Sequence, residues 1–429
     1  MKKINIGIIG FGTIGCGVIK ALKQKRSFLR EKTGIDINIK LICDKDLKAK
    51  RPVKIEKKYL TKSISKVLYD PGIDIVVELV GGITPAKDIV MEALRQGKHV
   101  VTANKALLSE CGETIFDLAN KLGLCVGFEA SVGGGIPIIR ALKEGFVANS
   151  FGLIYGIING TSNFILTKMD EEGLEFTDAL ALAQSGGYAE RDPYLDISGC
   201  DAGHKLSILA LLGFGVAAKR GDIYTEGINN IEAQDILYAK EMGYAIKPLA
   251  IAKRAGDSVE LRVHPTLIPK SHLLANVRGV YNAIFVKGDL IGENLFYGQG
   301  AGAQPTSSAI VSDIIAIAKN AAQGCKAERC IGIKRDIGAI KKMAEVKTRY
   351  YIRFSAIDKP GVLARISGIL AKYKISIASV TQKERKYSSV VPILMMTHDA
   401  LERDMAKALK EIDALSMIRK KSVRVRVEG

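Results

Sequence analysis

The chain has 429 residues, a formal net charge of +18 and a hydrophobic content of 47%. This length predicts two or three domains with full-sized cores, and no apolar run approaches the roughly 20 residues of a membrane-spanning helix. The seven cysteines are odd in number and include no CxxC pair, which indicates a reducing compartment.

The positive charge is spread over loops and helix faces, without the aromatic-plus-basic array or helix-turn-helix pattern of a nucleic-acid-binding protein. We therefore expect no nucleic-acid partner, and a surface field that favours an anionic cofactor and a carboxylate substrate. The five histidines are scattered, so no zinc site is expected. The first 16 residues mimic a secretory signal, but their glycines would break its helix, so we expect a cytoplasmic protein without a membrane partner.

The first predicted strand, residues 4–9, runs into the sequence GFGTIG at Gly10–Gly15, and a helix is predicted from there to about Lys25. This is the G-x-G-x-x-G spacing between a strand and a helix. The first glycine makes the turn, the second admits a pyrophosphate and the third lets the helix pack on the strand. The pattern predicts a dinucleotide-binding loop.

A second strand, residues 36–43, ends at Asp44, where a carboxylate can bind the adenosine ribose. Lys45, Lys48 and Arg51 follow and suit a 2′-phosphate instead. The choice between NAD and NADP stays open at this point.

The alternation of strands and helices then continues, with strands predicted at 74–79, 99–102 and 124–128, and helices at 62–69, 85–96 and 105–122. Such alternation predicts a parallel doubly wound sheet that binds ligands at the carboxyl ends of its strands. Asn104 and Lys105 fall at that edge, although a plain surface lysine is the alternative for Lys105.

A glycine-dense turn follows at residues 129–137, EASVGGGIP. Its backbone can offer carbonyls to a cation or amides to an anion, or it can be a plain hinge between domains.

The pattern changes after Ala148, where β-rich runs at 151–159, 258–263 and 281–286 alternate with helices. We expect an α+β substrate domain whose strands are distant in sequence. A second glycine-rich loop, residues 298–306, opens a helix at 307–322 that can return to the dinucleotide domain.

The most distinctive stretch is residues 186–212, which carries a dense acidic cluster and Lys205 ahead of an apolar helix; its acidic members are Glu190, Asp192, Asp196 and Asp201. Asp201 and Lys205 are four residues apart, so on a helix they lie one turn apart on one face. Burial would lower the pKa of such a lysine towards the range in which it exchanges protons. The alternative is an exposed ion pair at the start of a helix.

From about residue 349 the pattern restarts, after a basic linker near residues 334–347. Strands at 350–357, 376–381, 388–397 and 423–427 and helices at 362–373 and 400–411 predict a ferredoxin-like βαββαβ unit. Asp358, Gly361 and Val362 lie where its first strand turns into its first helix, whose N-terminus can receive a carboxylate. The exposed edge of so small a sheet favours pairing with a second copy.

With these motifs in place, the chain resembles the homoserine dehydrogenase family along almost its whole length, and its C-terminal unit resembles ACT regulatory domains. The resemblance rests on GFGTIG, TANKALL, EASVGGGIP, NGTSNFIL, GYAERDPYLDISGCDAGHKL, RVHPTLIP, GAGAQPTSSA and DKPGVL, in family order. It implies NAD(P)-linked interconversion of homoserine and aspartate 4-semialdehyde, on the route to threonine, methionine and isoleucine.

The family's domain organisation implies three parts: a Rossmann-type domain at 1–130, completed by about 300–325, a substrate and dimerisation domain at 131–320, and an ACT domain at 349–429. Catalytic roles are implied for Lys205 and Lys105, and substrate binding for Glu190, Asp196 and Asp201. Cofactor contacts are implied for Gly10, Phe11, Gly12, Thr13, Ile14, Gly15, Lys105 and Gly302.

The resemblance also implies a Na⁺ site at Glu129, Val132, Gly134 and Ile136, an effector site at Asp358, Gly361 and Val362, and a homodimer or homotetramer. Threonine is the expected effector, although Ser376 stands where many ACT domains carry Asn. Two alternatives remain open: a nonenzymatic sensor or regulatory subunit, and a dehydrogenase of another small amino acid semialdehyde. The intact lysine and carboxylate set argues against a sensor, which needs no proton-transfer lysine.

Overall fold

The computed structural model describes residues 2–323, 339–382 and 390–429. The chain forms two compact units, each assembled from distant segments. The first unit comprises Met1–Ile154, His204–Asp222 and Asn282–Ile337, and the second comprises Tyr155–Gly203, Ile223–Tyr281 and Gly338–Gly429. Part of the linker expected at 334–347, and the start of the strand expected at 388–397, lie outside the described residues.

The first unit is built on a parallel sheet with strand order β3-β2-β1-β4-β5-β6. The strand order reverses at β1, which is where doubly wound sheets bind their ligands. The expected parallel sheet is therefore confirmed. Its strands are β1 (Lys2–Ile9), β2 (Ile35–Cys43), β3 (Leu60–Thr61), β4 (Ile75–Glu78), β5 (His99–Thr102) and β6 (Val126–Gly127).

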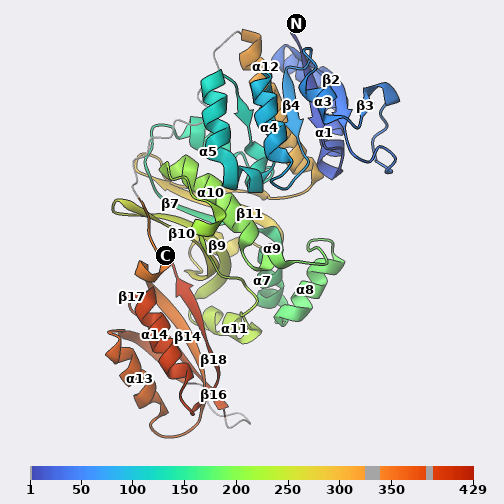
Figure 1. The fold of residues 1–429 in the computed structure, drawn as a ribbon. Helices are drawn as coiled ribbons and strands as arrows, with labels where there is room; N and C mark the ends of the chain where they lie inside the picture. The colour runs from blue at the N-terminus through green and yellow to red at the C-terminus, as the bar shows by residue number, and fades with distance from the viewer. Residues whose placement is uncertain (1, 324–338, 383–389) are drawn as a thin grey trace. The chain divides into compact units, whose positions relative to one another are not determined.

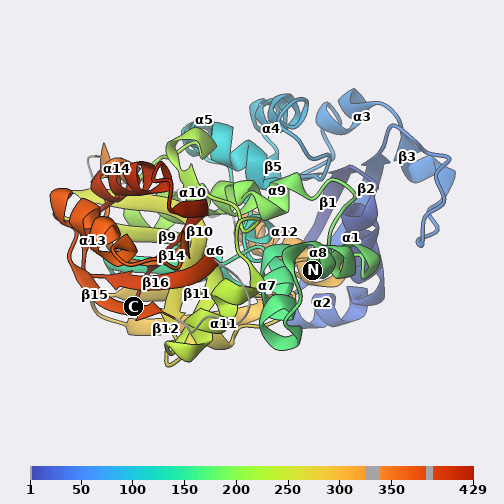
Figure 2. The ribbon, with the colours of Figure 1, turned by 90° about the horizontal axis from the view of Figure 1, so that it is seen from below.

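Helices cover both faces of this sheet, with α4 and α5 on one face and α1 and α12 on the other (Figures 1 and 2). Helix α12 is distant in sequence from β1, yet Ile310 and Ile314 of α12 share one buried cluster with Ile8. The helices are α1 (Thr13–Gln24), α2 (Arg26–Thr33), α3 (Ile64–Leu68), α4 (Ala86–Arg95), α5 (Lys105–Leu122), α6 (Ile138–Arg140) and α12 (Ala303–Gln323).

The residues of three further elements are divided between the two units: β7 (Phe151–Ile157), α10 (Cys200–Phe214) and β11 (Tyr281–Gly288). Strand β12 (Gly292–Gln299) follows β11 within the first unit. Among the described residues, no helix is both long enough and apolar enough to cross a membrane.

The second unit contains a sheet in which β9, β10, β18, β14, β16 and β15 are successive neighbours. Strand β18 pairs in parallel with β10 and antiparallel with β14. The main strands are β9 (Tyr244–Ala255), β10 (Ser258–Pro269), β14 (Lys347–Ile357), β15 (Ile377–Gln382), β16 (Val390–Thr397) and β18 (Ile418–Val427). Short strands are β8 (Tyr224–Thr225), β13 (Ala339–Ile340) and β17 (Ala400–Leu401).

Successive residues of β14 face two different cores, because side chains alternate along a strand. Tyr351 packs with the helices that follow β7, whereas Tyr350 packs with those of the C-terminal region. The first set is α7 (Gly160–Glu172), α8 (Phe176–Ser185), α9 (Tyr194–Ile197) and α11 (Ala233–Glu241), and the second is α13 (Val362–Lys372) and α14 (Glu402–Asp413). The order β14, α13, β15, β16, α14, β18 is the expected βαββαβ unit, which is confirmed.

Strand β10 is longer than its sequence indicates. The β-rich run was expected at residues 258–263, leading to His264 and Pro265. The observed strand continues to Pro269, with Pro265 opposite Pro248 of β9. Neither proline has an N–H that the pairing could leave unsatisfied, so the pair is tolerated in mid-strand.

Candidate active site

Each glycine of the GFGTIG loop is favoured at its position for a different structural reason. Gly10 has φ +111°, a conformation that favours glycine, and Gly15 approaches so closely that a Cβ there would lie 2.2 Å from the carbonyl oxygen of Gly10. A Cβ at Gly12 would meet nothing within 4 Å, so open space lies where a pyrophosphate is expected to approach. The loop therefore fits a dinucleotide.

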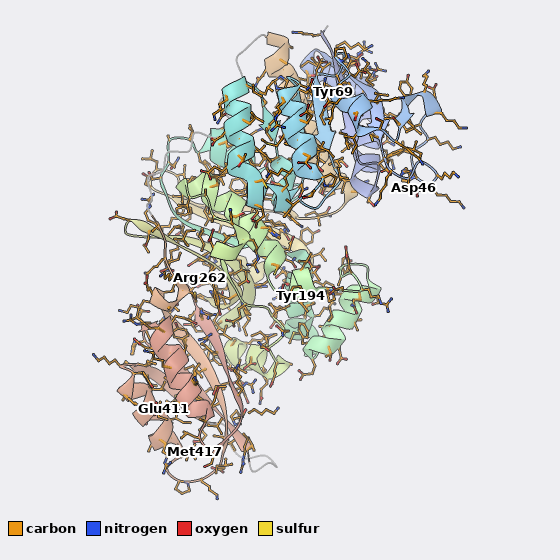
Figure 3. All side chains as sticks on the ribbon, viewed as in Figure 1. Asp46, Tyr69, Tyr194, Arg262, Glu411 and Met417 are labelled. Atoms are coloured by element: carbon orange, nitrogen blue, oxygen red, sulfur yellow. The ribbon has the colours of Figure 1, made fainter. Side chains whose placement is uncertain are left out.

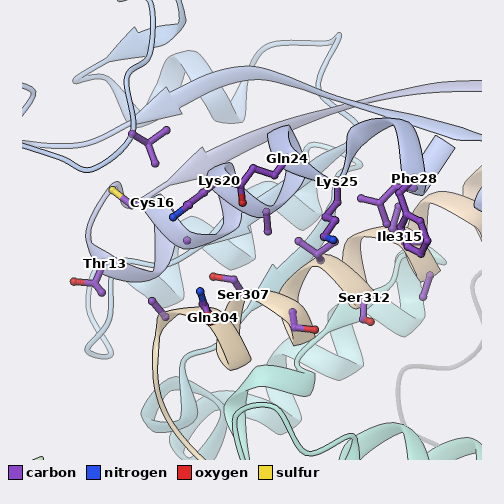
Figure 4. Close-up of a pocket in the computed structure, with 18 of the residues that line it drawn as sticks. Thr13, Cys16, Lys20, Gln24, Lys25, Phe28, Gln304, Ser307, Ser312 and Ile315 are labelled. Carbon is purple, nitrogen blue, oxygen red and sulfur yellow. The ribbon is translucent and has the colours of Figure 1, made fainter.

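This loop opens onto a groove of about 1950 Å³ between α1 and α12, all within the first unit (Figure 4). Thr13 and Cys16 line it from α1, and Gln304 and Ser307 line it from the start of α12, which follows Gly302 (φ +114°). Ile14 is half-buried beside the loop. The groove places the expected cofactor residues Phe11, Gly12 and Thr13 on one surface.

Asp44, which directly follows β2, binds the glycine loop through its side chain. One carboxylate oxygen accepts the N–H of Phe11 at 2.7 Å, and the other lies 3.2 Å from the guanidinium of Arg51. Arg51 also donates to the carbonyl of Phe11 at 2.7 Å and stacks over its ring, 4.5 Å from the ring centre. Arg51 and Asp44 thus form one polar cluster at the place where the adenosine ribose is expected.

The carboxyl ends of β4 and β5 are held together by buried Glu78. Its two carboxylate oxygens accept hydrogen bonds from the Thr102 hydroxyl and the Val80 N–H, each at 2.7 Å. Asn104 then caps α5 by accepting from Leu107 N, and its amide donates to Gly82 O at 2.6 Å. These contacts fix Lys105, the first residue of α5, at the edge where ligands are expected.

Lys205 is buried on α10, with 8% of its surface exposed. Two residues further along, Ser207 donates a hydrogen bond to Ser109 of α5 at 2.9 Å. This contact lies within the first unit and packs the helix of Lys205 against the helix of Lys105.

Asp201 and Asp196 are joined by one amide within the second unit. The Asn159 side-chain nitrogen donates to Asp196 at 2.7 Å and to Asp201 at 2.9 Å, while its oxygen accepts from Ser162 N and caps α7. Asp201 is buried, Asp196 is half-buried, and Glu190 is exposed. The structure thus brings two of the three expected substrate carboxylates together and leaves Glu190 outside this hydrogen-bonded set.

The glycine-dense turn 129–137 packs closely against the second glycine-rich loop, residues 298–306. Gly134 has φ +56°, and a Cβ there would lie 2.6 Å from the carbonyl of Gly300. A Cβ at Gly300 would in turn lie 1.8 Å from the amide of Asn282, which is buried with both polar atoms lacking a hydrogen-bond partner. Such a buried amide needs a polar partner such as water or an ion.

Side chains do not form the expected cation site. The Glu129 carboxylate accepts from Ile139 N at 2.8 Å and from Arg140 N at 2.9 Å, so it is already engaged. In the part of the chain that the structure describes, no group of three or more His, Cys, Asp or Glu side chains could hold a metal. A cation at Glu129, Val132, Gly134 and Ile136 would therefore depend on backbone carbonyls.

Asp313 of α12 lies beside this turn and is 6% exposed. Burial raises the pKa of its carboxyl to about 7, even though it accepts the N–H of Glu129 at 2.8 Å and lies 3.6 Å from the Arg140 guanidinium. Desolvation outweighs these two favourable contacts.

The C-terminal turn is exposed at Asp358 and Gly361. Gly361 has φ +87° and caps α13, which begins at the buried Val362. The turn therefore presents a helix N-terminus at the surface, as the DKPGVL sequence predicts.

The expectations from sequence did not include Asn159, Glu78 or Thr102. Asn159 carried a signal, because Asn-Gly-Thr-Ser before a helix is a capping pattern, but its second role depends on carboxylates 37 and 42 residues away. Glu78 ends an apolar strand, and a buried carboxylate there becomes visible only once its partner Thr102 is placed beside it.

Comparisons with known proteins identify the same family over nearly the whole chain. The family model described as "Homoserine dehydrogenase, NAD binding domain" matches residues 10–129, that described as "Homoserine dehydrogenase" matches 137–315, and an ACT domain model matches 350–416. A homoserine dehydrogenase of Neisseria gonorrhoeae is 43% identical, with 100% of this chain and 99% of the relative covered. One of Bacillus subtilis is 37% identical, with 100% and 99% covered.

Solved structures give the same result. A homoserine dehydrogenase from Thiobacillus denitrificans has a TM-score of 0.91 and 43% identity, covering 100% of this chain and 99% of that one. A hyperthermophilic archaeal homoserine dehydrogenase in complex with NADPH has a TM-score of 0.63 and 25% identity, covering 76% and 100%. With a dinucleotide loop, a parallel sheet and full-length relatives in agreement, this chain belongs to the homoserine dehydrogenase family, a family of oxidoreductases.

Proposed function

We propose that the chain interconverts L-homoserine and L-aspartate 4-semialdehyde with Lys205 as the proton-transfer residue. The observation that carries this assignment is the start of α10, where buried Lys205 follows Asp201 by one turn and Asp201 shares the Asn159 amide with Asp196. Two carboxylates held at one amide suit the ammonium group of an amino acid substrate.

The chemistry needs a group that moves a proton while a hydride moves. A bound nicotinamide supplies or accepts the hydride. Lys205 takes the proton of the substrate hydroxyl in oxidation, and its ammonium stabilises the developing alkoxide in reduction. Lys105, fixed by Asn104 at the end of β5, supplies a second positive charge near the same oxygen. Homoserine made in this way feeds the synthesis of threonine, methionine and isoleucine.

We propose NADP as the preferred cofactor. Both carboxylate oxygens of Asp44 already accept hydrogen bonds, from Phe11 N and Asp46 N, so Asp44 is less available to ribose hydroxyls. Arg51, whose guanidinium also donates to the carbonyls of Phe11, Ala49 and Asp46, and the exposed Lys45 and Lys48 offer positive charge to a 2′-phosphate. NADPH is also the ligand named for the archaeal family member. Arg51→Gln should weaken NADPH binding more than NADH binding in a fluorescence titration, whereas Arg95→Gln on α4 should change neither.

The interlocked glycine turns fit a monovalent cation. The positive φ angles of Gly133 and Gly134 fold the turn tightly, and the unpartnered amide of Asn282 lies against the adjoining Gly300. We propose that the carbonyls of Glu129, Val132, Gly134 and Ile136 hold Na⁺. Thermal unfolding in Na⁺ and in an organic cation of equal ionic strength tests this: a specific site raises Tm only in Na⁺.

We propose that threonine binds at the turn of Asp358, Gly361 and Val362, where the N-terminus of α13 can receive its carboxylate. Among the described residues, β15 is the edge strand of its sheet, and its Val380 is exposed. We therefore further propose that two copies associate through this edge. Inhibition by millimolar threonine and the mass of the particle by light scattering test the two proposals separately.

The activity itself is tested by following the oxidation of NADPH and NADH at 340 nm with aspartate 4-semialdehyde as substrate. Turnover with this aldehyde, and much slower turnover with the semialdehyde one carbon longer, would support the assignment. A chain that binds the dinucleotide but turns over neither aldehyde would instead be a sensor or regulatory subunit.

A further inference from the structure

The last strand of the chain lies inside the sheet of the second unit. Thr266 and Leu267 of β10 pair in parallel with Arg426 and Val427 of β18, and the other edge of β18 pairs with β14. On β10, the buried Arg262, labelled in Figure 3, forms ion pairs with Glu260 and with Glu428 just beyond β18. The C-terminal region is therefore built into this unit and is not merely tethered to it.

Arg426 is the centre of a second buried cluster. Its side chain is fully buried and forms a bidentate pair with Glu402 of α14, with distances of 2.6 and 2.9 Å. Its remaining terminal nitrogen donates to Glu226 at 2.8 Å, and Glu226 also accepts from the Tyr224 hydroxyl at 2.7 Å. One guanidinium thus joins a carboxylate of the C-terminal region to a carboxylate that follows β8.

The residues after Glu226 contact the acidic segment of the candidate active site. Ile228 N donates to Ile197 O at 3.0 Å, and a Cβ at Gly227 would lie 2.5 Å from the same oxygen. Glu226 N in turn donates to Val263 O of β10 at 2.8 Å. The segment 226–228 is therefore held on both sides, with almost no room to move against Ile197.

Ile197 directly follows Asp196, whose carboxylate shares the Asn159 amide with Asp201. These two hydrogen bonds are 2.7 and 2.9 Å long, and a shift of the backbone at Ile197 would lengthen at least one of them. Hydrogen bonds weaken steeply with such changes, and a site built for an ammonium group loses affinity when its acceptors move apart.

We propose that Arg426 and Glu226 are positioning residues through which the C-terminal region holds Asp196 and Asp201 at the spacing that the amino acid substrate requires. The proposal rests on the proposed function of the two carboxylates. It makes the described residues of the C-terminal region, 339–382 and 390–429, part of the support of the substrate site. A ligand that binds this region could then change the affinity for homoserine through Arg426 and Glu226. All the residues of this route lie within the second unit.

The test compares Glu226→Gln with Glu232→Gln in the full-length protein. Both variants remove one carboxylate from an arginine of the C-terminal sheet, because Glu232 pairs with Arg353 at 2.8 Å. Glu226 directly precedes Gly227 and Ile228, the residues that contact Ile197, whereas Glu232 lies four residues beyond Ile228. Because Glu226→Gln replaces a charge-assisted hydrogen bond to Arg426 with a weaker neutral one, it should raise the KM for homoserine about fivefold or more and leave the Kd for NADPH unchanged. Glu232→Gln should leave both constants unchanged.

Hydrogen exchange provides a readout that does not depend on activity. Peptides covering residues 192–201 should exchange faster in Glu226→Gln than in Glu232→Gln. An unchanged homoserine KM together with unchanged exchange at 192–201 would overturn the positioning role, even if Tm falls. If the unmodified protein fails to oxidise homoserine, the proposed function is wrong, whereas the exchange comparison still decides whether Glu226 controls this segment.

Discussion

Ser207 of α10 donates a hydrogen bond to Ser109 of α5, with 2.9 Å between the two hydroxyl oxygens. Both side chains are buried, and they lie two residues after Lys205 and four residues after Lys105, respectively. The contact therefore fixes how the helices of the two lysines are set against each other.

We expect the serine pair to contribute to turnover because it holds the helices of Lys205 and Lys105 in a fixed relative position. Ser207→Ala and Ser109→Ala should each lower kcat a few-fold, and the double variant should be no worse than the more affected single one, because the pair acts as one contact. Steady-state kinetics of the three variants checks this. Additive losses would mean that the two hydroxyls act independently.

Gly12→Val separates cofactor binding from folding. A Cβ at Gly12 meets no protein atom within 4 Å, so the chain should fold with nearly unchanged Tm. The side chain would fill the space for the pyrophosphate, and the Kd for NADPH should rise by about tenfold or more. In the matched variant Gly15→Val, the Cβ lies 2.2 Å from Gly10 O, so stability should fall instead. Unchanged cofactor affinity in Gly12→Val would assign the glycine to the turn alone.

Asn159→Ser tests the amide that joins the two carboxylates. Serine keeps a helix cap for α7 but cannot reach both Asp196 and Asp201. Losing one hydrogen bond to a charged group costs about 1.5 to 3 kcal/mol, so the KM for homoserine should rise by about tenfold or more while the Kd for NADPH stays constant. Equal changes in both constants would point to a general loss of structure.

The raised pKa of Asp313 predicts that the stability of the folded protein depends on pH. Its pKa in the folded protein is about 7, because burial raises it above the usual value of about 3.9. Between these two pH values the folded state keeps a proton that the unfolded state has lost, so this group's contribution to stability declines as the pH rises from about 4 to 7. The full loss is roughly 4 kcal/mol at most.

The isosteric variant Asp313→Asn removes this titration and keeps an acceptor for Glu129 N. Its Tm relative to that of the unmodified protein should therefore be higher at pH 8 than at pH 4.5, as measured by calorimetry. A Tm difference that does not change with pH would show that Asp313 stays ionised throughout.

Local sequence patterns predicted the elements whose ends are marked by local chemistry. The helix expected at 105–122 is observed at Lys105–Leu122, because Asn104 caps its start and Gly123, with φ +66°, ends it. The first glycine loop and the first turn of the βαββαβ unit were predicted for the same reason, since Gly10–Gly15 and the Asp358–Gly361 turn carry glycine or proline signals.

Apart from the return of the helix expected at 307–322 to the dinucleotide domain, contacts between distant segments were not predicted. Nothing local to Arg426 indicates that its partner is Glu226, 200 residues earlier, or that β18 lies beside β10 as well as β14. The sharing of Asn159 by Asp196 and Asp201 is likewise a property of the folded chain. A sequence pattern can identify which residues carry charge, but the pairing of those charges depends on tertiary structure.

The most direct test of the proposed mechanism is the turnover of Lys205→Ala with homoserine and NADP. Removal of the proton-transfer group should lower kcat by about 10² to 10⁴-fold, while the Kd for NADPH measured by fluorescence titration stays nearly unchanged. Turnover within a few-fold of that of the unmodified protein would contradict the assignment and remove Lys205 from the mechanism.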